Sequence, residues 1–128
     1  MAKYFKKENG MKNNQLVLLS KIFAIKVIEV YNSLLRNDKI VPIAGQFLRS
    51  GTSIGANIHE ANYAASRADF INKLQIAMKE CYETDYWLGL FHETHSVASE
   101  TYEELFAACS KIRKLLTASI TTAKKNID

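Results

Sequence analysis

The sequence has no apolar run long enough to cross a bilayer, and its N-terminus lacks the charged, apolar and small-residue leader of a secreted protein. These absences argue against a membrane partner and predict a cytoplasmic protein. Cysteine is scarce as well: Cys81 and Cys109 have no CxxC spacing and fall on core-facing helix positions. They are expected to be reduced, buried thiols, so neither a disulfide, a metal nor a cofactor is predicted.

The chain has 128 residues, of which 48% are hydrophobic, enough for one domain with a substantial core. It carries 17 lysine and arginine residues against 13 acidic ones, a formal net charge of +4. This modest excess of positive charge permits an acidic partner such as nucleic acid without demanding one.

Apolar residues recur at threes and fours in four segments, which is the spacing of one face of a helix. Helices are predicted over about 14–36, 42–62, 67–95 and 100–124. Because the loops between them are short, consecutive helices should be antiparallel neighbours. The predicted fold is all-α, an up-down-up-down antiparallel four-helix bundle over residues 14–125, and residues 1–13 are expected to form a basic, disordered N-terminal segment.

Three helix starts have their own signals in the sequence. The single proline, Pro42, suits a first helical turn, where its missing N–H would be unpaired anyway. Ser66 followed by Asp69 resembles a capping box with a shortened acid and predicts the start of the third helix. Ser99 is expected to cap the fourth helix.

The first predicted helix is apolar over an unusually wide arc. Its polar side chains crowd into roughly 140° of the circumference, and apolar ones cover the rest. One bundle interface does not need so wide a face, so we expect this helix to contact another subunit. The alternative is that the long third helix, with Trp87 and Leu90 off its main apolar stripe, covers the surplus within one chain.

Two glycines, Gly51 and Gly55, lie inside the second predicted helix, where each costs roughly 1 kcal/mol relative to alanine. With Ala44 they form a track of small residues that lets another backbone approach closely. We expect a side chain at either glycine to push that neighbour away.

The other flank of this helix carries a polar stripe within about 100° of arc. We expect Arg49 and Glu60 to find partners on a neighbouring helix or subunit, with the serines and Asn57 completing a polar network. The stripe comprises Gln46, Arg49, Ser50, Ser53, Asn57 and Glu60.

The run RSGTSIGANIHEA at residues 49–61, followed by SRADFINKLQIAMKECYETDYWLGLF at residues 66–91, resembles the four helix bundle protein family, also called the 23S ribosomal RNA intervening-sequence protein family. The resemblance covers nearly all of the chain from about residue 11 onward. The matching positions include Arg49, Ser50, Ser53, Asn57 and Glu60 of the stripe and, in the second run, Glu80, Glu83 and Trp87. The resemblance implies a bacterial homopentamer with no established enzymatic activity, distantly related to accessory proteins of diversity-generating retroelements, whose basic pentamer engages a reverse transcriptase and nucleic acid.

Asp85 departs from the family pattern, because it lies in the core arc of the third helix where many members carry leucine. We expect Asp85 to be a partner of Arg49. With Glu80 and Glu83, it completes the polar network that the sequence predicts between helices.

Enzyme functions are less well supported. The di-iron bundles need repeated Glu-x-x-His pairs, and no glutamate here has a histidine three residues on. Glu80-x-x-Glu83 and Glu100-x-x-Glu103 resemble the paired acids of all-α metal-dependent nucleotide hydrolases. However, Glu83 lies roughly 18 Å from the turn beside which Glu100 begins its helix, so these acids should not converge. We expect no catalytic residues, no small-molecule substrate and no metal.

Basic residues carry the remaining functional signal. Repeated around a ring, a weak patch becomes multivalent, and its phosphate contacts add through counterion release. We therefore expect a homo-oligomer that binds RNA or a nucleoprotein partner; a protein scaffold without nucleic-acid binding is the alternative. Lysines at a helix C-terminus also satisfy the helix dipole. The candidate nucleic-acid-binding residues are Lys111, Lys114, Lys124 and Lys125 of the fourth helix, with Lys6 and Lys7 of the N-terminal segment.

Overall fold

A computed structural model describes residues 10–126, with side chains from residue 15 onward. Four helices make up almost all of it: α2 (Gly10–Leu34), α3 (Val41–Ala61), α4 (Arg67–Glu93) and α5 (Ser99–Lys125). The predicted helices match these closely, except that α2 starts earlier, at a residue expected to lie in the N-terminal segment. The structure confirms the all-α four-helix bundle.

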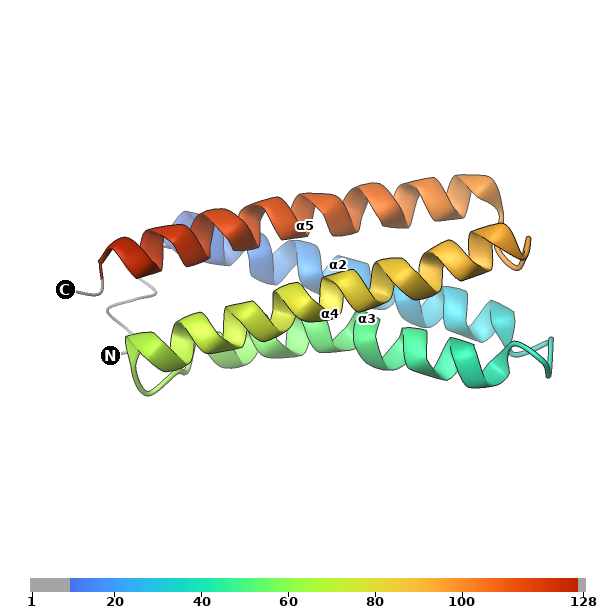
Figure 1. Ribbon diagram of the computed structural model, residues 1–128, viewed down its shortest axis with the longest axis horizontal. Helices are drawn as coiled ribbons and strands as arrows, with labels where there is room; N and C mark the ends of the chain where they lie inside the picture. The colour runs from blue at the N-terminus through green and yellow to red at the C-terminus, as the bar shows by residue number, and fades with distance from the viewer. Residues whose placement is uncertain (1–9, 127–128) are drawn as a thin grey trace.

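The helices run antiparallel in chain order (Figure 1). α2 packs against α3 and α5, α3 against α4, and α4 against α5, so each consecutive pair is adjacent and the last helix returns beside the first. Within residues 10–126, no helix is both long and apolar enough to span a membrane.

The core runs the length of the bundle along one stripe of each helix. Its largest fully buried side chains are Phe23, Phe47, Phe70 and Phe91, and the rings of Phe47 and Phe91 meet edge to face at 5.3 Å between α3 and α4. Cys81 and Cys109 are free and buried, as the sequence predicts.

The predicted helix starts are partly confirmed. Pro42 lies in the first turn of α3, and the backbone N–H of Asp69 donates to the Ser66 hydroxyl at 3.1 Å. The Ser99 prediction is wrong. Ala98 already has the extended backbone of a capping residue, so Ser99 is the first residue inside α5 and no side chain caps this helix.

Candidate functional site

The polar stripe of α3 meets α4 through Arg49. Its guanidinium pairs with Glu83 and with Glu80, at 3.3 Å from Nη1 to Oε2 of Glu80, while its Nε donates to Gln46 at 3.4 Å. The indole N–H of Trp87 donates to the same Glu83 at 3.0 Å. The expected neighbouring-helix partner of Arg49 is confirmed, and it is a pair of acids.

Glu60 also reaches α4, where Lys73 Nζ lies 3.7 Å from its carboxylate. Ser53 and Asn57 do not join the cross-helix network that the sequence predicts. The Ser53 hydroxyl donates to the carbonyl of Arg49 at 2.6 Å, and the Asn57 amide donates to the carbonyl of Ser53 at 2.8 Å, one turn back along α3. Both side chains therefore form hydrogen bonds within α3 and not with α4.

Ser50 is the buried member of the stripe. It is fully buried with Thr84 of α4, whose hydroxyl donates to the Ser50 hydroxyl at 2.9 Å. Thr84 is not predicted from the sequence as a core residue, because it is polar. The available signal was its position between Cys81 and Leu88, on the core phase of α4.

The predicted contact between Asp85 and Arg49 is wrong. Asp85 pairs with Arg113 of α5, and their side chains are only 17% and 18% exposed. Successive residues of a helix point about 100° apart, so Asp85 faces α5 whereas Glu83 and Glu80 face α3. Burial raises the pKa of Asp85 in spite of Arg113, and its Oδ1 has no hydrogen-bond partner among the described residues.

Arg113 itself is a residue that the sequence analysis did not single out. Besides Asp85, it donates from Nη2 to the Ser110 hydroxyl at 2.9 Å, and its guanidinium lies over the ring of Tyr82, 5.2 Å from the centroid. A single arginine thus connects a half-buried acid to an exposed aromatic ring.

The two glycines of the small-residue track have different surroundings in the structure. A Cβ at Gly51 would lie 2.8 Å from both γ-carbons of Val27, so the close approach of α2 at this position is confirmed. At Gly55 the nearest atoms belong to Ser20, at 3.4 Å, which is ordinary contact. The expectation that a side chain at Gly55 would push α2 away is wrong for a methyl group, because the α2 residue opposite Gly55 is the small Ser20 whereas the branched Val27 lies opposite Gly51.

The acids of the hydrolase hypothesis do not assemble. Glu80 and Glu83 are held by Arg49 in the middle of α4, whereas Glu100 lies in the first turn of α5. Across residues 10–126, no three histidine, cysteine or acidic side chains are placed to hold a metal ion together.

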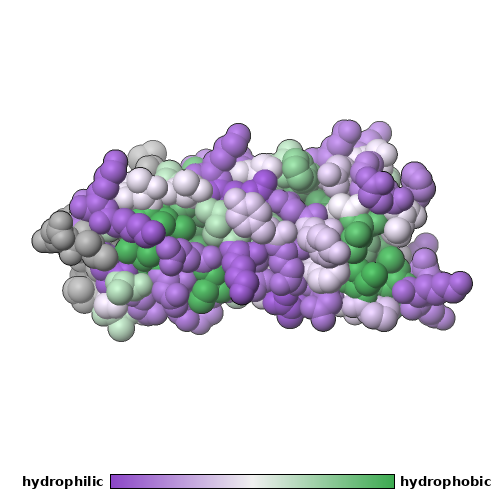
Figure 2. Space-filling model, in the orientation of Figure 1, coloured by the Kyte–Doolittle hydropathy of each residue, from purple (hydrophilic) through white to green (hydrophobic). Residues whose placement is uncertain are grey.

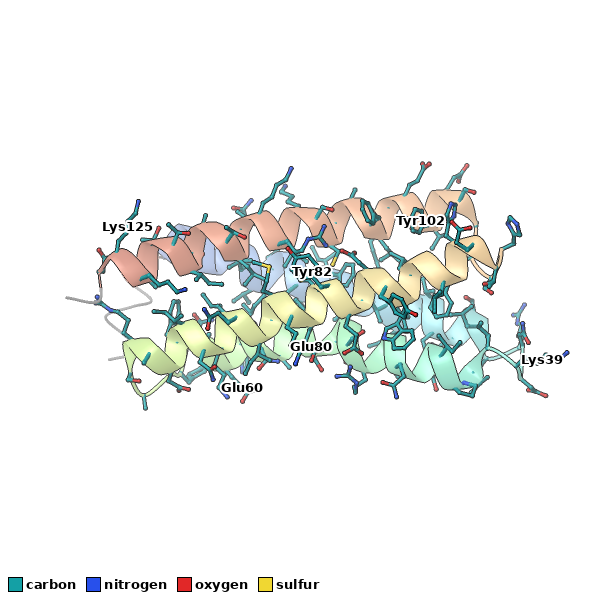
Figure 3. The ribbon with its side chains drawn as sticks, viewed as in Figure 1. Lys39, Glu60, Glu80, Tyr82, Tyr102 and Lys125 are labelled. Atoms are coloured by element: carbon teal, nitrogen blue, oxygen red, sulfur yellow. The ribbon has the colours of Figure 1, made fainter. Side chains whose placement is uncertain are left out.

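The lysines of α5 are all exposed and make no ion pair with the described residues. No acid occurs between Glu104 and Asp128, so the helix has an acidic start and a basic remainder. Figure 3 shows Lys125 at one end of the bundle and Lys39 at the other. Lys6 and Lys7 lie outside the described residues. The four α5 residues, which we call the lysine surface, are Lys111, Lys114, Lys124 and Lys125.

Exposed apolar side chains form a row on α2. Leu18, Ile22, Ile25 and Ile28 are each between 43% and 59% exposed, although they are aliphatic. The alternative that α4 covers this face is wrong, because these side chains stay exposed and α2 packs against α3 and α5.

Comparison with known proteins adds the family. The model of the family described as 23S rRNA-intervening sequence protein matches residues 12–118 of this chain. A solved structure from Bacteroides thetaiotaomicron, described as a protein with unknown function from the S23 ribosomal protein family, is 46% identical with a TM-score of 0.83. The match covers 86% of this chain and 98% of that one. Nothing among curated proteins matches.

Proposed function

The chain belongs to the 23S rRNA-intervening sequence protein family, and from that premise we propose that it is a non-enzymatic cytoplasmic homo-oligomer that binds RNA or a nucleoprotein partner through the lysine surface. The observation that carries the proposal is the charge of α5. Five basic residues follow Glu104 in this helix with no acid among them, and its four lysines are exposed. Phosphate groups are the ligands that such a surface attracts.

The exposed apolar row of α2 is the observation that supports self-association. Contiguous apolar patches of this kind on a monomer mark interfaces. Beside the row, a groove of about 310 Å³ between α2 and α3 is lined mainly by small side chains, including Ala24, Thr52 and Gly55. Its shape suits an aliphatic ridge of a second copy. We propose five copies in a ring, the number that the family resemblance implies.

A ring strengthens weak phosphate binding. Each protomer contributes one lysine surface, and several surfaces that engage one RNA raise the apparent affinity without any new contact. Binding of this kind is directed at the RNA backbone, so it should tolerate differences in sequence and weaken steeply as salt rises.

The test is fluorescence anisotropy of a labelled structured RNA across a salt series. We expect the wild type to bind at low salt, and the double variant Lys111→Glu, Lys114→Glu to lose most of that binding. The matched control is Arg36→Glu, Lys39→Glu, which makes the same charge change in the exposed loop between α2 and α3.

Two other outcomes would redirect the proposal. Absence of RNA binding by the wild type at low salt overturns it and leaves a protein scaffold as the function. The polar stripe of α3 is a poor docking site for such a partner, because Arg49, Ser50 and Glu60 already bind α4. Nucleoside-triphosphate turnover that Glu80→Gln abolishes would instead establish the metal-dependent hydrolase.

A further inference from the structure

Two tyrosines of α4 lie on the outer face of the bundle, one helical turn apart. Tyr82 and Tyr86 are each 61% exposed. Residues four apart on a helix share a face and are separated by about 6 Å along its axis. In Figure 3, Tyr82 lies midway along the bundle, where α4 and α5 run side by side.

The ring of Tyr82 is fixed from the α5 side. Arg113 lies over it at 5.2 Å from the centroid, and Arg113 is itself held by Asp85 and by the Ser110 hydroxyl. A cation over an aromatic ring is attracted by the negative face of the π system. The side chain is thereby oriented before any ligand arrives, while most of its surface stays open.

The ring of Tyr86 is supported by a second and separate network. The indole of Trp87 meets it edge to face at 5.1 Å between centroids and donates its N–H to Glu83, which Arg49 binds from α3. Two ion-pair networks with no shared member therefore hold two neighbouring rings, each of which presents open aromatic surface to solvent.

The charges around the two rings are positive. Lys79 lies three residues before Tyr82 on the same face of α4, where its charge helps to lower the pKa of Glu83. Lys114 follows Arg113 on α5 and points about 100° away from it around the helix. Both lysines are exposed and make no ion pair with residues 15–126. The neighbouring acids of α4, Glu83 and Asp85, are each paired with an arginine. Figure 2, which views this side of the bundle, shows a largely hydrophilic surface with separated apolar groups.

Two further exposed acids lie at one end of this face. Glu93 and Glu103 are exposed near the turn between α4 and α5, beyond the stacked pair of His92 and Tyr102. A polyanion would therefore lie over Tyr82 and Tyr86 and extend toward the C-terminal end of α5.

We propose that Tyr82 and Tyr86 stack on unpaired nucleobases of single-stranded RNA, with Lys79 and Lys114 contacting the phosphates between them. Aromatic side chains beside a basic track are how proteins bind single strands without sequence preference, because every base has a π face. This inference rests on the proposed function and specifies it: the preferred ligand is an unpaired strand rather than a duplex.

The experiment compares a labelled oligouridine with a blunt RNA duplex of the same length by anisotropy at low salt. We expect Tyr82→Ala, Tyr86→Ala to weaken oligouridine binding by about 10-fold or more, and to leave duplex binding unchanged. Tyr82→Phe, Tyr86→Phe keeps the rings and should keep the affinity. The matched control is Tyr63→Ala, because Tyr63 is 72% exposed in the turn between α3 and α4, away from Arg113 and Trp87. Circular dichroism and mass in solution confirm that each variant is folded and assembled.

Each other outcome has a defined meaning. Unchanged oligouridine binding in Tyr82→Ala, Tyr86→Ala, together with lost binding in Lys111→Glu, Lys114→Glu, overturns the stacking inference and leaves the proposed function standing. No binding of either RNA by the wild type overturns both. A change in oligomer mass on removing the tyrosines assigns this face to a protein interface and overturns the inference as well.

Discussion

The hydroxyl of Thr84 donates a hydrogen bond to the hydroxyl of Ser50 at 2.9 Å, between two helices and in complete isolation from solvent. Ser50 in turn donates to the carbonyl of Phe47 at 3.3 Å. Ser50 follows Arg49 and Thr84 follows Glu83 in the sequence, so this contact is next to the ion pair of Arg49 with Glu83. The Thr84 hydroxyl also lies 2.7 Å from the carbonyl oxygen of Glu80, so each buried hydroxyl has a partner in its own helix as well as in the other one.

Replacing Thr84 with valine keeps the side-chain shape and removes the donor. We expect the free energy of unfolding to fall by about 1 kcal/mol, the net contribution of one hydrogen bond. The double variant Ser50→Ala, Thr84→Val should cost less than the two single variants together, because the shared hydrogen bond is lost only once. Urea denaturation measures all three; strict additivity would show that the contact contributes nothing.

Alanine substitutions at the two helix-interior glycines should change the stability of the protein in opposite directions. Gly51→Ala places a methyl group against the buried Val27, and overpacking of this kind costs about 1–3 kcal/mol. Gly55→Ala meets only ordinary contacts and gains about 0.5–1 kcal/mol from helix propensity. Thermal denaturation compares them, and Val27→Ala should partly restore Gly51→Ala. Equal effects at both sites would contradict the difference between the contacts with Val27 and with Ser20.

The pKa values of Glu83 and Asp85 are shifted in opposite directions by folding. The hydrogen bond from Trp87, helped by Arg49, lowers the pKa of Glu83, whereas burial raises the pKa of Asp85. A lowered pKa in the folded state gives stability that is present above the unfolded pKa and is lost as pH falls through the folded one. A raised pKa has the reverse sign: stability decreases as pH rises from the unfolded value to the folded value.

Stability measured between about pH 7 and pH 3 should therefore separate the two acids. As pH falls, the advantage of the wild type over Glu83→Gln should shrink, while the wild type should gain relative to Asp85→Asn. Chemical denaturation at a series of pH values gives both differences. Parallel curves for the wild type and either variant would show that the carboxyl concerned has the same pKa in both states.

The apolar row of α2 predicts a loss of assembly on charge insertion. Ile22→Glu, Ile25→Glu places two carboxylates where the proposed interface would bury them, and an unpaired buried charge is strongly unfavourable. We expect the mass in solution, measured by light scattering, to fall to that of one 14.5 kDa chain with helicity retained. Leu35→Glu, at a residue of similar exposure near the end of α2, is the control. A wild type that is already monomeric would remove the oligomer from the proposal.

The two thiols should be inert in the native protein. A hydrogen bond with Cys81 and burial raise the pKa of Cys109, and the thiolate is the reactive form. We expect neither cysteine to react with a thiol reagent until denaturant is added, with two equivalents released on unfolding. Fast reaction of either thiol in native buffer would mean that the α4–α5 seam opens locally.

The sequence predicts the bundle well because long helices with an apolar stripe have few ways to pack. Helix order, antiparallel pairing and the burial of both cysteines follow from the spacing of apolar residues alone. The N-terminus of α5 does not, because its capping residue, Ala98, is set by the backbone conformation of the preceding turn and has no side chain that signals a cap.

The polar contacts were predicted less well. The stripe that contains Arg49 indicates that a partner exists, but helical periodicity does not say which neighbour a flank meets. Asp85 looked like the partner because it is an acid in an apolar arc, whereas the actual partners lie on the opposite flank of α4. Arg113 gave no signal, since an isolated arginine in a basic helix is indistinguishable from a solvated one.

The contacts of α3 with α4 also determine how the two helices are aligned. Arg49 with Glu83, Ser50 with Thr84, and Glu60 with Lys73 all require the same offset between the chains. Apolar stripes can slide by a turn and still bury similar surfaces, but such a slip would break all three pairs. The polar stripe therefore sets the register of the bundle, and with it the positions of Trp87 and Tyr86 on the outer face.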